Sequence, residues 1–373
     1  MLLVSHSYGY GGDLMYYGEI FNELRKLEPR LAIAVDRDTD FANPHRLDLR
    51  PLYRRRAIGL PSGEGYAREL HAASPALAAR VAKLAPEVLV TIEFTPVSLL
   101  AMFGSLASRG TKRVLLVESD PAERGASTSA SVLAIKRRAV GRADAIRTNN
   151  EAGARYLVDT LGADSGKVDV GSYLTSRPPG PAVKIEPRDG PLRLFFANSL
   201  TGRKNARVLI EALGMLDDAT KSAVSLTIVG DGDQRAMLEN LASERGVIEH
   251  VRFIGRRAYA DLGECYADAD VLVNPTSLDY RSLSSFEGLG YGLALLVSDR
   301  DGASRETVIE GKTGFTFAPA DPQALAGHIA ALASDRDRLL AMRRNSLALY
   351  EEKFSLGQAA ANIAATIARA REA

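Results

Sequence analysis

Short apolar runs alternate with longer stretches of helical spacing along almost the whole chain. The runs are LLVSHS, LAIAVD, VLVTIE, RVLLVES and AIRTNN in the first half, then LRLFFAN, SLTIVGDG, VRFIG, ADVLVNP and LALLVSD. Runs of this length, bounded by turn or charged residues, are typical of buried strands. Because helical stretches such as residues 13–27 and 206–216 lie between them, the pattern predicts parallel strands joined by helical crossovers.

Residues 176–193, SRPPGPAVKIEPRDGPLR, interrupt this alternation. Their prolines and glycines exclude regular structure over most of the segment and indicate an interdomain linker. With 373 residues, two domains are expected: an N-terminal Rossmann-like domain over 1–183 and a C-terminal one over 184–350. A helix over 351–373 is expected to cross back to the N-terminal domain. The predicted fold class is α/β with two doubly wound domains and a cleft between them, where a small-molecule site is expected.

The composition excludes several classes of protein. The hydrophobic content of 46% and charged content of 25% are typical of a soluble globular protein. No apolar run reaches the length of a membrane span, no secretory signal opens the chain, and a single cysteine, Cys265, fits a reducing compartment. We therefore expect a cytoplasmic protein, and the net charge of +1 gives no reason to expect nucleic acid as a partner.

The first half of the chain is mildly basic. Residues 1–183 carry 24 Lys and Arg against 20 Asp and Glu, with local basic runs at 54–56 and 136–138. A solvated surface accounts for this. The alternative is peripheral contact with an anionic membrane on its cytoplasmic face, or with a phospholipid-like acceptor.

Two glycine loops follow predicted strands. In SHSYGYGGD, Gly11 and Gly12 lie before a helix, where backbone N–H groups can approach an anion. Leu14 stands where a dinucleotide fingerprint needs its third glycine, and Arg235 stands there in VGDGDQR. No dinucleotide cofactor is therefore expected. Gly11 and Gly12 are candidates for contact with a substrate, and a tight strand-to-helix turn is the structural alternative.

No resident metal is expected. Three Asp-x-Asp triplets, at 36–38, 268–270 and 299–301, are scattered over different strand ends and are interpreted as solvated. The five histidines lack the spacing of a zinc site, and Cys265 stands alone.

A pair of cations, Arg203 and Lys204, stands directly before a predicted helix. Cations are unfavourable at this end of the helix dipole unless an anion is bound there. After the strand ADVLVNP, the loop TSLDYRSL leads into a second helix, where Ser284 and Glu287 have the spacing of a capping box. Free amides at 281–284 together with Lys204 predict an anion cradle, with Asp279 and Glu287 beside it as hydroxyl acceptors. A diphosphate with a sugar on each side suits this set of groups.

The second half of the chain resembles the donor domain of GT-B glycosyltransferases, specifically the retaining family 4. The motifs follow the family order from residue 193 to 355: SLTIVGDGDQRAMLE, VRFIGRRAYADLGECYADADVLVNPT, DYRSLSSFEGLGYG, SDRDGASRETVIEGKTGF and EKFS. The first half resembles the family's acceptor domain more loosely, through GYGGD and GRADAIRTNNEA.

The resemblance implies roles for single residues. The family's E-x7-E element appears as Asp279 and Glu287, which implies that Glu287 binds the nucleotide ribose and Asp279 lies beside the donor sugar. Lys204 falls on the family's phosphate-binding lysine, and the base is expected near Arg256. The resemblance also implies three backbone amides that hold the diphosphate: Arg281, Ser282 and Leu283.

The sequence departs from the family at three points. Asp279 stands where Glu is usual, and Ser199 falls near the position of the arginine that partners the lysine, so that Arg203 is its expected substitute. The histidine of the first domain's active-site loop is missing from LLVESDPAERG. The candidates to orient the acceptor or assist proton transfer in its place are Glu118, Asp120 and, in TIEFTP, Glu93.

The expected function is that of a retaining, metal-independent, hexosyltransferase-like enzyme. It would transfer a sugar from a UDP-, GDP- or other nucleotide-diphosphate sugar to a hydroxyl of a carbohydrate or lipid-linked acceptor, without a further cofactor. Bacterial surface polysaccharide or glycolipid synthesis is the expected setting. Two alternatives stay open: a nucleotide-sugar epimerase of the same fold, and a non-catalytic relative that binds nucleotide sugars.

Overall fold

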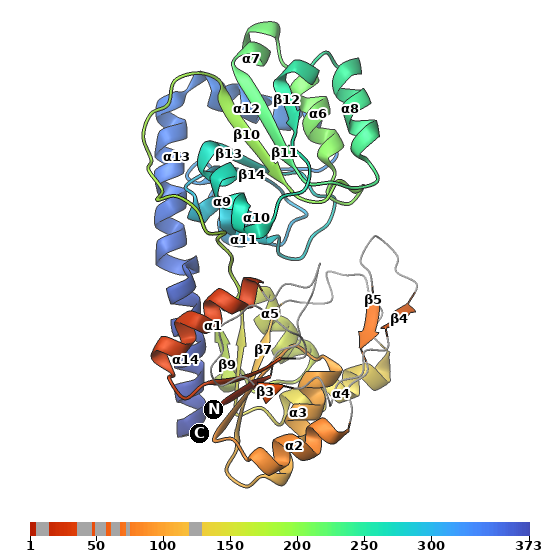
Figure 1. The fold of residues 1–373 in the computed structure, drawn as a ribbon, viewed down its shortest axis with the longest axis vertical. Helices are drawn as coiled ribbons and strands as arrows, with labels where there is room; N and C mark the ends of the chain where they lie inside the picture. The colour runs from red at the N-terminus through yellow and green to blue at the C-terminus, as the bar shows by residue number, and fades with distance from the viewer. Residues whose placement is uncertain (5–14, 36–46, 49–56, 61–67, 72–74, 119–128) are drawn as a thin grey trace. The chain divides into compact units, whose positions relative to one another are not determined.

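The computed structural model describes residues 1–4, 15–35, 47–48, 57–60, 68–71, 75–118 and 129–373. These residues form two compact units (Figure 1). The first comprises Met1–Leu174 and Leu356–Ala373, and the second comprises Thr175–Ser355. Three of the predicted site residues, Gly11, Gly12 and Asp120, lie outside the described residues.

The first unit is built on a parallel sheet in the order β3-β2-β1-β6-β7-β8-β9. Its strands are β1 (Leu2–Val4), β2 (Ala32–Val35), β3 (Leu47–Asp48), β6 (Val88–Ile92), β7 (Lys112–Val117), β8 (Ala145–Thr148) and β9 (Val168–Val170). A separate antiparallel pair joins β4 (Ala57–Leu60) to β5 (Arg68–His71). The strand order reverses between β1 and β6, which is the doubly wound topology predicted from the sequence.

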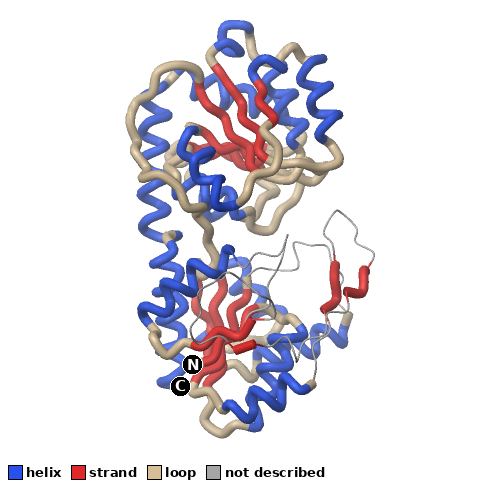
Figure 2. The backbone as a smooth tube through the Cα atoms, in the orientation of Figure 1, coloured by secondary structure: helices blue, strands red, loops and turns tan. Residues whose placement is uncertain are grey.

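Helices cover both faces of this sheet (Figure 2). They are α1 (Met15–Leu27), α2 (Ala76–Leu84), α3 (Pro96–Gly104), α4 (Ala130–Val140), α5 (Glu151–Arg155) and α14 (Leu356–Glu372). Short 3₁₀ helices are η2 (Ser105–Ala107) and η5 (Ser165–Lys167), and a π-helical segment, η4 (Tyr156–Thr160), continues α5. The last helix, α14, packs beside α1. Polar contacts hold α14 in place: Arg147 of β8 donates to the hydroxyl of Thr366 at 2.7 Å, and Arg371 pairs with Glu28 at 2.7 Å.

The second unit repeats the topology with a six-stranded parallel sheet, ordered β12-β11-β10-β13-β14-β15. Its strands are β10 (Leu192–Ala197), β11 (Val224–Val229), β12 (Val251–Phe253), β13 (Val271–Asn274), β14 (Ala294–Ser298) and β15 (Gly314–Phe317). Its helices are α6 (Ala206–Gly214), α7 (Asp218–Ser222), α8 (Arg235–Glu244), α9 (Tyr259–Asp268), α10 (Leu283–Gly290), α11 (Ser304–Thr307), α12 (Pro322–Ser334) and α13 (Arg336–Leu349), with η6 (Ile248–His250) and η7 (Tyr350–Phe354). The first strand of the unit, β10, lies in the middle, and the order reverses between β10 and β13.

Alternate residues of β10 serve two hydrophobic cores. Leu194 and Phe196 pack with α6, α8 and α12 on one face, and Phe195 packs with α9 and α10 on the other. Side chains of a strand alternate between the faces of its sheet, so a strand buried on both faces is apolar at most positions. This explains why LRLFFA carries an apolar run rather than an alternating pattern. The exception in β10 is Arg193, which is partly exposed and pairs with Asp268 at 2.8 Å.

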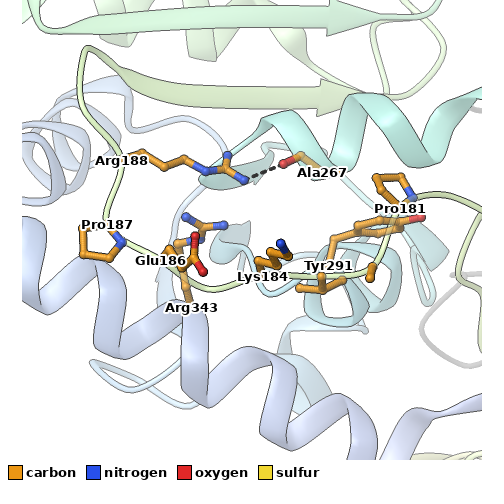
Figure 3. A pocket seen from close by; sticks show the side chains of 10 residues that line it. Pro181, Lys184, Glu186, Pro187, Arg188, Ala267, Tyr291 and Arg343 are labelled. Atoms are coloured by element: carbon orange, nitrogen blue, oxygen red, sulfur yellow. Dashed lines mark hydrogen bonds between the residues drawn. The ribbon is translucent and has the colours of Figure 1, made fainter.

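The segment that opens the second unit, residues 176–191, has no regular structure, as its prolines predict. It is nevertheless fixed against the unit. The hydroxyl of Tyr291 donates to the carbonyl of Pro178 at 2.6 Å, and Gly263 approaches so closely that an added Cβ would lie 2.0 Å from the carbonyl oxygen of Pro179. Farther along, the linker borders a cavity of about 330 Å³ lined by Arg188 and Arg343, among others (Figure 3).

One buried carboxylate, Asp270, holds this end of the linker to α13. Arg343 donates to Asp270 at 3.0 Å and to the carbonyl of Gly292 at 3.0 Å, while Arg188 reaches the same Asp270 oxygen at 3.4 Å. The side chain of Arg343 is only 4% exposed, and burial lowers the pKa of its guanidinium.

We expect Arg343→Met to lower the free energy of unfolding by about 3 kcal/mol, because it removes one partner of a buried ion pair. The neighbouring Arg344 is exposed, so Arg344→Met should change the same quantity by less than about 0.5 kcal/mol. Urea denaturation of both variants measures the difference. Equal effects of the two substitutions would show that the Asp270 cluster does not stabilise the unit.

Candidate functional site

The candidate site lies at the carboxyl ends of β10 and β13, where the strand order of the second sheet reverses (Figure 1). The loops that follow these two strands are bonded to each other. Ser277 donates its amide to the carbonyl of Arg203 at 2.9 Å, and Asn205 donates its side-chain amide to the carbonyls of Pro275 and Pro319 at 3.0 and 2.9 Å. Asn205 precedes α6 in the left-handed conformation and does not cap that helix with its side chain. Its side chain joins the loops instead.

Three predicted site residues form one ion cluster. The Asp279 carboxylate accepts from Lys204 Nζ at 2.7 Å and from Arg203 Nη1 at 2.8 Å. Its second oxygen accepts from the amide of Tyr280 at 2.9 Å. Between 11% and 15% of each of the three charged side chains is exposed. Burial alone would raise the pKa of Asp279, but Lys204 and Arg203 outweigh it and hold the pKa below its usual range.

A second carboxylate, Asp301, lies directly behind Asp279. It is completely buried and accepts bonds from the amide of Ser282 at 3.2 Å, from the hydroxyl of Ser282, and from the amide of Ala303 at 3.0 Å. Burial and the charge of Asp279 raise the pKa of Asp301 to about 6. The interpretation of this strand end as solvated is therefore wrong for Asp301, because a loop distant in sequence folds over it. It is also wrong for Asp270, which is buried and paired with Arg343. The triplet at 36–38 lies outside the described residues.

The amino end of α10 differs from its predicted form. Ser282, not Ser284, is the N-cap residue, and its side chain makes no capping bond. Ser284 instead exchanges hydrogen bonds with the side chain of Asn274, at 2.9 and 3.2 Å. The predicted capping box between Ser284 and Glu287 is therefore wrong. Asn274, the polar residue that ends the apolar run of β13, was the overlooked signal for this network.

The three predicted diphosphate amides are not equivalent in the structure. The amide of Ser282 is engaged by Asp301, whereas Leu283 begins α10, where a helix has no carbonyl of its own to accept from its first amides. The Arg281 guanidinium forms a bidentate pair with Glu306 at 2.9 Å and lies 3.8 Å above the ring of Phe286. The side chain of Arg281 therefore fixes the loop. Its backbone amide stays a predicted ligand of the diphosphate.

Glu287 lies in the second turn of α10 and is 5% exposed. One carboxylate oxygen accepts from Ser176 of the linker at 2.7 Å, and the other accepts from Tyr266 of α9 at 2.5 Å. Burial raises the pKa of Glu287, and these two hydroxyls together with Lys204 act in the opposite direction. Sequence reasoning gave no signal for Ser176 or Tyr266, because each is distant from Glu287 along the chain.

The loop Gly230-x-Gly232 has a packing role. A Cβ on Gly230 would lie 1.9 Å from the carbonyl oxygen of Asn198, and one on Gly232 would lie 2.3 Å from that of Leu200. The glycines therefore allow this loop to press against the loop that carries Arg203. Arg256, the residue expected near the base, is exposed between β12 and α9.

In the first unit, Glu118 and Glu93 are brought together. Glu93 follows β6, where the strand order reverses, and has a positive φ of 57°. Its carboxylate accepts from the amide of Glu118, and Asn149 donates to the carbonyl of Glu118 at 3.2 Å. Positive φ is strained for a residue with a side chain and is enriched at functional sites. Both glutamates therefore stay predicted site residues.

Two kinds of feature are absent from the described part of the chain. Within it, no group of three or more His, Cys, Asp or Glu side chains is placed to hold a metal ion. No helix there is both long and apolar enough to cross a bilayer.

The architecture matches solved structures over almost the whole chain. The HepE protein of Anabaena, solved in complex with UDP, aligns over 98% of this chain and 99% of its own with a TM-score of 0.71 at 18% identity. WaaG, a glycosyltransferase involved in lipopolysaccharide biosynthesis, aligns over 98% of both chains with a TM-score of 0.63 at 16% identity.

The chain has the GT-B fold.

Sequence comparison finds a family match and several relatives for the second half of this GT-B chain. Residues 182–348 match the family model described as glycosyl transferases group 1. A Mycobacterium tuberculosis glycogen synthase is 31% identical over 42% of this chain and 37% of its own length. A GDP-mannose-dependent alpha-(1-6)-phosphatidylinositol monomannoside mannosyltransferase of Mycolicibacterium smegmatis is 28% identical over 72% of this chain and 74% of its own. The chain spans about half or less of several other relatives, among them the Mycobacterium leprae phosphatidyl-myo-inositol mannosyltransferase at 52%.

The raised pKa of Asp301 predicts a pH-dependent stability. A carboxyl group whose pKa is higher in the folded state stabilises that state at low pH, and the contribution is lost as pH rises through the folded value of about 6. We expect the free energy of unfolding of the wild type, relative to Asp301→Asn, to fall by about 1 kcal/mol from pH 5 to pH 7. Asp279 is present in both proteins, so its own pH dependence largely cancels. Urea denaturation at both pH values measures this; a difference independent of pH would contradict the assignment.

Proposed function

We propose that the protein is a retaining glycosyltransferase that moves a sugar from a nucleotide-diphosphate sugar to a hydroxyl acceptor. The observation that carries this proposal is the ion cluster of Lys204, Arg203 and Asp279 at the reversal point of the second sheet. Two nearly buried cations before a helix N-terminus are a site for a diphosphate. The family match over residues 182–348 and the relatives that use a nucleotide sugar by name support the same donor class.

When it binds, the diphosphate takes the place of the Asp279 carboxylate as the partner of the two cations, Lys204 and Arg203. Lys204 and Arg203 then neutralise the charge that develops on the leaving diphosphate, together with the amino end of α10. Asp279, released from its ion pairs, is placed to accept a hydrogen bond from a hydroxyl of the donor sugar. This exchange requires no metal ion, because the chain itself supplies the positive charge.

Glu287 binds the nucleoside end of the proposed donor. An ionised carboxylate offers about four acceptor positions, and the structure uses one on each oxygen. The remaining two suit the 2′- and 3′-hydroxyls of a ribose. Arg256 is the candidate for contact with the base, and UDP- and GDP-sugars are the donors to test first.

The acceptor hydroxyl attacks the donor carbon from the face that the diphosphate leaves. The leaving phosphate takes the acceptor's proton, so that no protein nucleophile is needed. Glu118 is proposed to orient the acceptor or assist this transfer, with Glu93 fixed beside it. The setting proposed is synthesis of a bacterial surface polysaccharide or glycolipid at the cytoplasmic face of the membrane.

The test is a transfer assay with UDP- and GDP-sugars over a panel of acceptors. We expect a product that keeps the donor's anomeric configuration by NMR. Lys204→Ala should lower turnover by about 100-fold, because it removes a charge that stabilises the transition state. Lys221→Ala, which removes a lysine paired with Asp218 on α7, is the matched control and should keep full turnover.

Four outcomes contradict parts of the proposal. An inverted product excludes the retaining mechanism, and Lys204→Ala with turnover within a few-fold of the wild type excludes the phosphate assignment. A new sugar nucleotide formed without an acceptor indicates an epimerase, while donor binding without any product indicates a non-catalytic relative.

Helix α4 supports a membrane-bound acceptor. Its side chains Val132 and Ile135 lie one helical turn apart and are 42% and 46% exposed. Lys136, Arg137 and Arg138 follow directly. Exposed apolar side chains beside a basic cluster suit the surface of an anionic bilayer.

We expect the protein to float with liposomes that contain anionic lipid, less at high salt, and not with purely zwitterionic liposomes. Replacing both Val132 and Ile135 by Asp should reduce the floating fraction several-fold. Met237→Asp, at another exposed apolar residue on α8, should leave it unchanged. Flotation that is insensitive to salt and to the double substitution would exclude α4 as the contact.

A further inference from the structure

A linker residue reaches the candidate nucleoside site. Ser176 is 1% exposed and lies at the beginning of the proline-rich segment. Its hydroxyl donates to Glu287 Oε1 at 2.7 Å and also contacts the hydroxyl of Tyr259. A hydroxyl carries one hydrogen. Because Ser176 donates its hydrogen to Glu287, the hydrogen bond between Ser176 and Tyr259 must be donated by the Tyr259 hydroxyl. The three residues thus form a chain of donors that ends on the carboxylate.

The second oxygen of Glu287 is held just as firmly. Tyr266, which donates to it, is completely buried. The Tyr266 ring packs edge-on against Phe195, with centroids 4.8 Å apart, and stacks on Tyr291 at 5.4 Å. The two donors therefore approach the carboxylate from different elements, one from α9 and one from the linker. Together they fix both the position and the rotation of the carboxylate plane.

The linker in turn has little freedom around Ser176. Pro178 accepts from the Tyr291 hydroxyl at 2.6 Å. An added Cβ on Gly180 would lie 2.4 Å from the same hydroxyl, and one on Gly263 would lie 2.0 Å from the carbonyl oxygen of Pro179. Backbone in such close contact cannot shift by an ångström without losing these bonds. The hydroxyl of Ser176 is consequently aimed at Glu287 by the packing of the linker itself.

We infer that Ser176 is a positioning residue of the nucleoside subsite, which turns the open acceptor positions of Glu287 toward the ribose diol and makes the linker part of the donor site. This inference rests on the proposed function, because it requires a nucleoside diphosphate as ligand. Ser176 acts through Glu287 and does not itself contact the ribose.

The same contact governs the ionisation of Glu287. Burial raises its pKa, and the groups of the described chain that lower it again are the hydroxyls of Tyr266 and Ser176 and the charge of Lys204. Loss of the Ser176 hydroxyl removes one of them, so the carboxylate takes up a proton at a higher pH. A protonated carboxyl group has lost an acceptor position for the diol, and nucleotide affinity falls with it.

The experiment is calorimetric titration of the full chain with UDP and GDP between pH 5 and pH 8. For the nucleotide that binds, we expect Ser176→Ala to weaken binding about tenfold at pH 7. The pH at which affinity falls on the acid side should move upward. The preference for the ribonucleotide over its 2′-deoxy form should shrink, because the diol contact is impaired.

Three further variants complete the test. Ser176→Thr keeps the hydroxyl and should restore most of the affinity. Tyr259→Phe removes the donor to Ser176 on a partly exposed side chain, and should weaken binding a few-fold in the same direction even where Ser176→Ala fails to fold. Arg188→Met loosens the far end of the linker by removing its bonds to Ala267 and Asp270, and should lower the melting temperature while leaving affinity unchanged.

The outcomes separate the inference from the function on which it rests. Wild-type protein that binds neither nucleotide overturns the proposed function and, with it, this inference. Wild-type binding with unchanged affinity, pH profile and 2′-hydroxyl preference in Ser176→Ala overturns the inference alone. An equal loss of affinity in Arg188→Met overturns it as well, because the effect would then follow from linker stability.

Discussion

One carboxylate balances two cations at the edge of the second sheet, and the geometry of the candidate site depends on this balance. Without Asp279, Lys204 and Arg203 would be nearly buried charges without compensation, which is costly. With it, they are held at fixed positions before any ligand arrives. In the proposed function, a diphosphate replaces the Asp279 carboxylate as the partner of these cations, which are already in position to accept it. The short side chain of Asp279, also bonded to its own loop through Tyr280, keeps the carboxylate at the cations.

The loop that carries Asp279 is fixed by a second acid, Asp301, whose pKa is shifted in the opposite direction. Asp279 has a lowered pKa because it faces two cations, and Asp301 has a raised pKa because it is buried behind the charge of Asp279. Two neighbouring carboxyl groups with separated pKa values need not ionise together, which avoids the repulsion of like charges. Gly302 makes this proximity possible, since an added Cβ there would lie 1.7 Å from the carbonyl oxygen of Tyr280.

Local pattern sufficed to predict the fold, and it brought some of the predicted site residues to one edge of the sheet. Apolar runs, helical spacing and the proline-rich segment depend on neighbours along the chain, and the doubly wound sheets followed from them. Arg203, Lys204 and Asp279 lie in loops that follow β10 and β13, and the structure brings them together because strands of a parallel sheet end at one edge. Their roles toward a ligand stay predictions. The capping box failed because Glu287 is satisfied by partners 111 and 21 residues away. The burial of Asp301 depends on a loop 19 residues upstream. Contacts at such separations leave no periodic trace in a single sequence.

The two ends of the proposed donor are therefore recognised by different physics. Charge dominates at the phosphates, where Lys204 and Arg203 attract any compact anion and discriminate little between them. Neutral hydroxyl donors dominate at Glu287, where the carboxylate is buried and each oxygen already holds one bond. A buried acceptor that is left without its partner costs the full free energy of its desolvation. A site built on hydrogen bonds therefore rejects an analogue that lacks a hydroxyl more strongly than an apolar pocket rejects an analogue of different size. Affinity is thus assigned to the ion cluster, whereas selectivity for a ribonucleotide is assigned to Glu287 and to the linker that orients it.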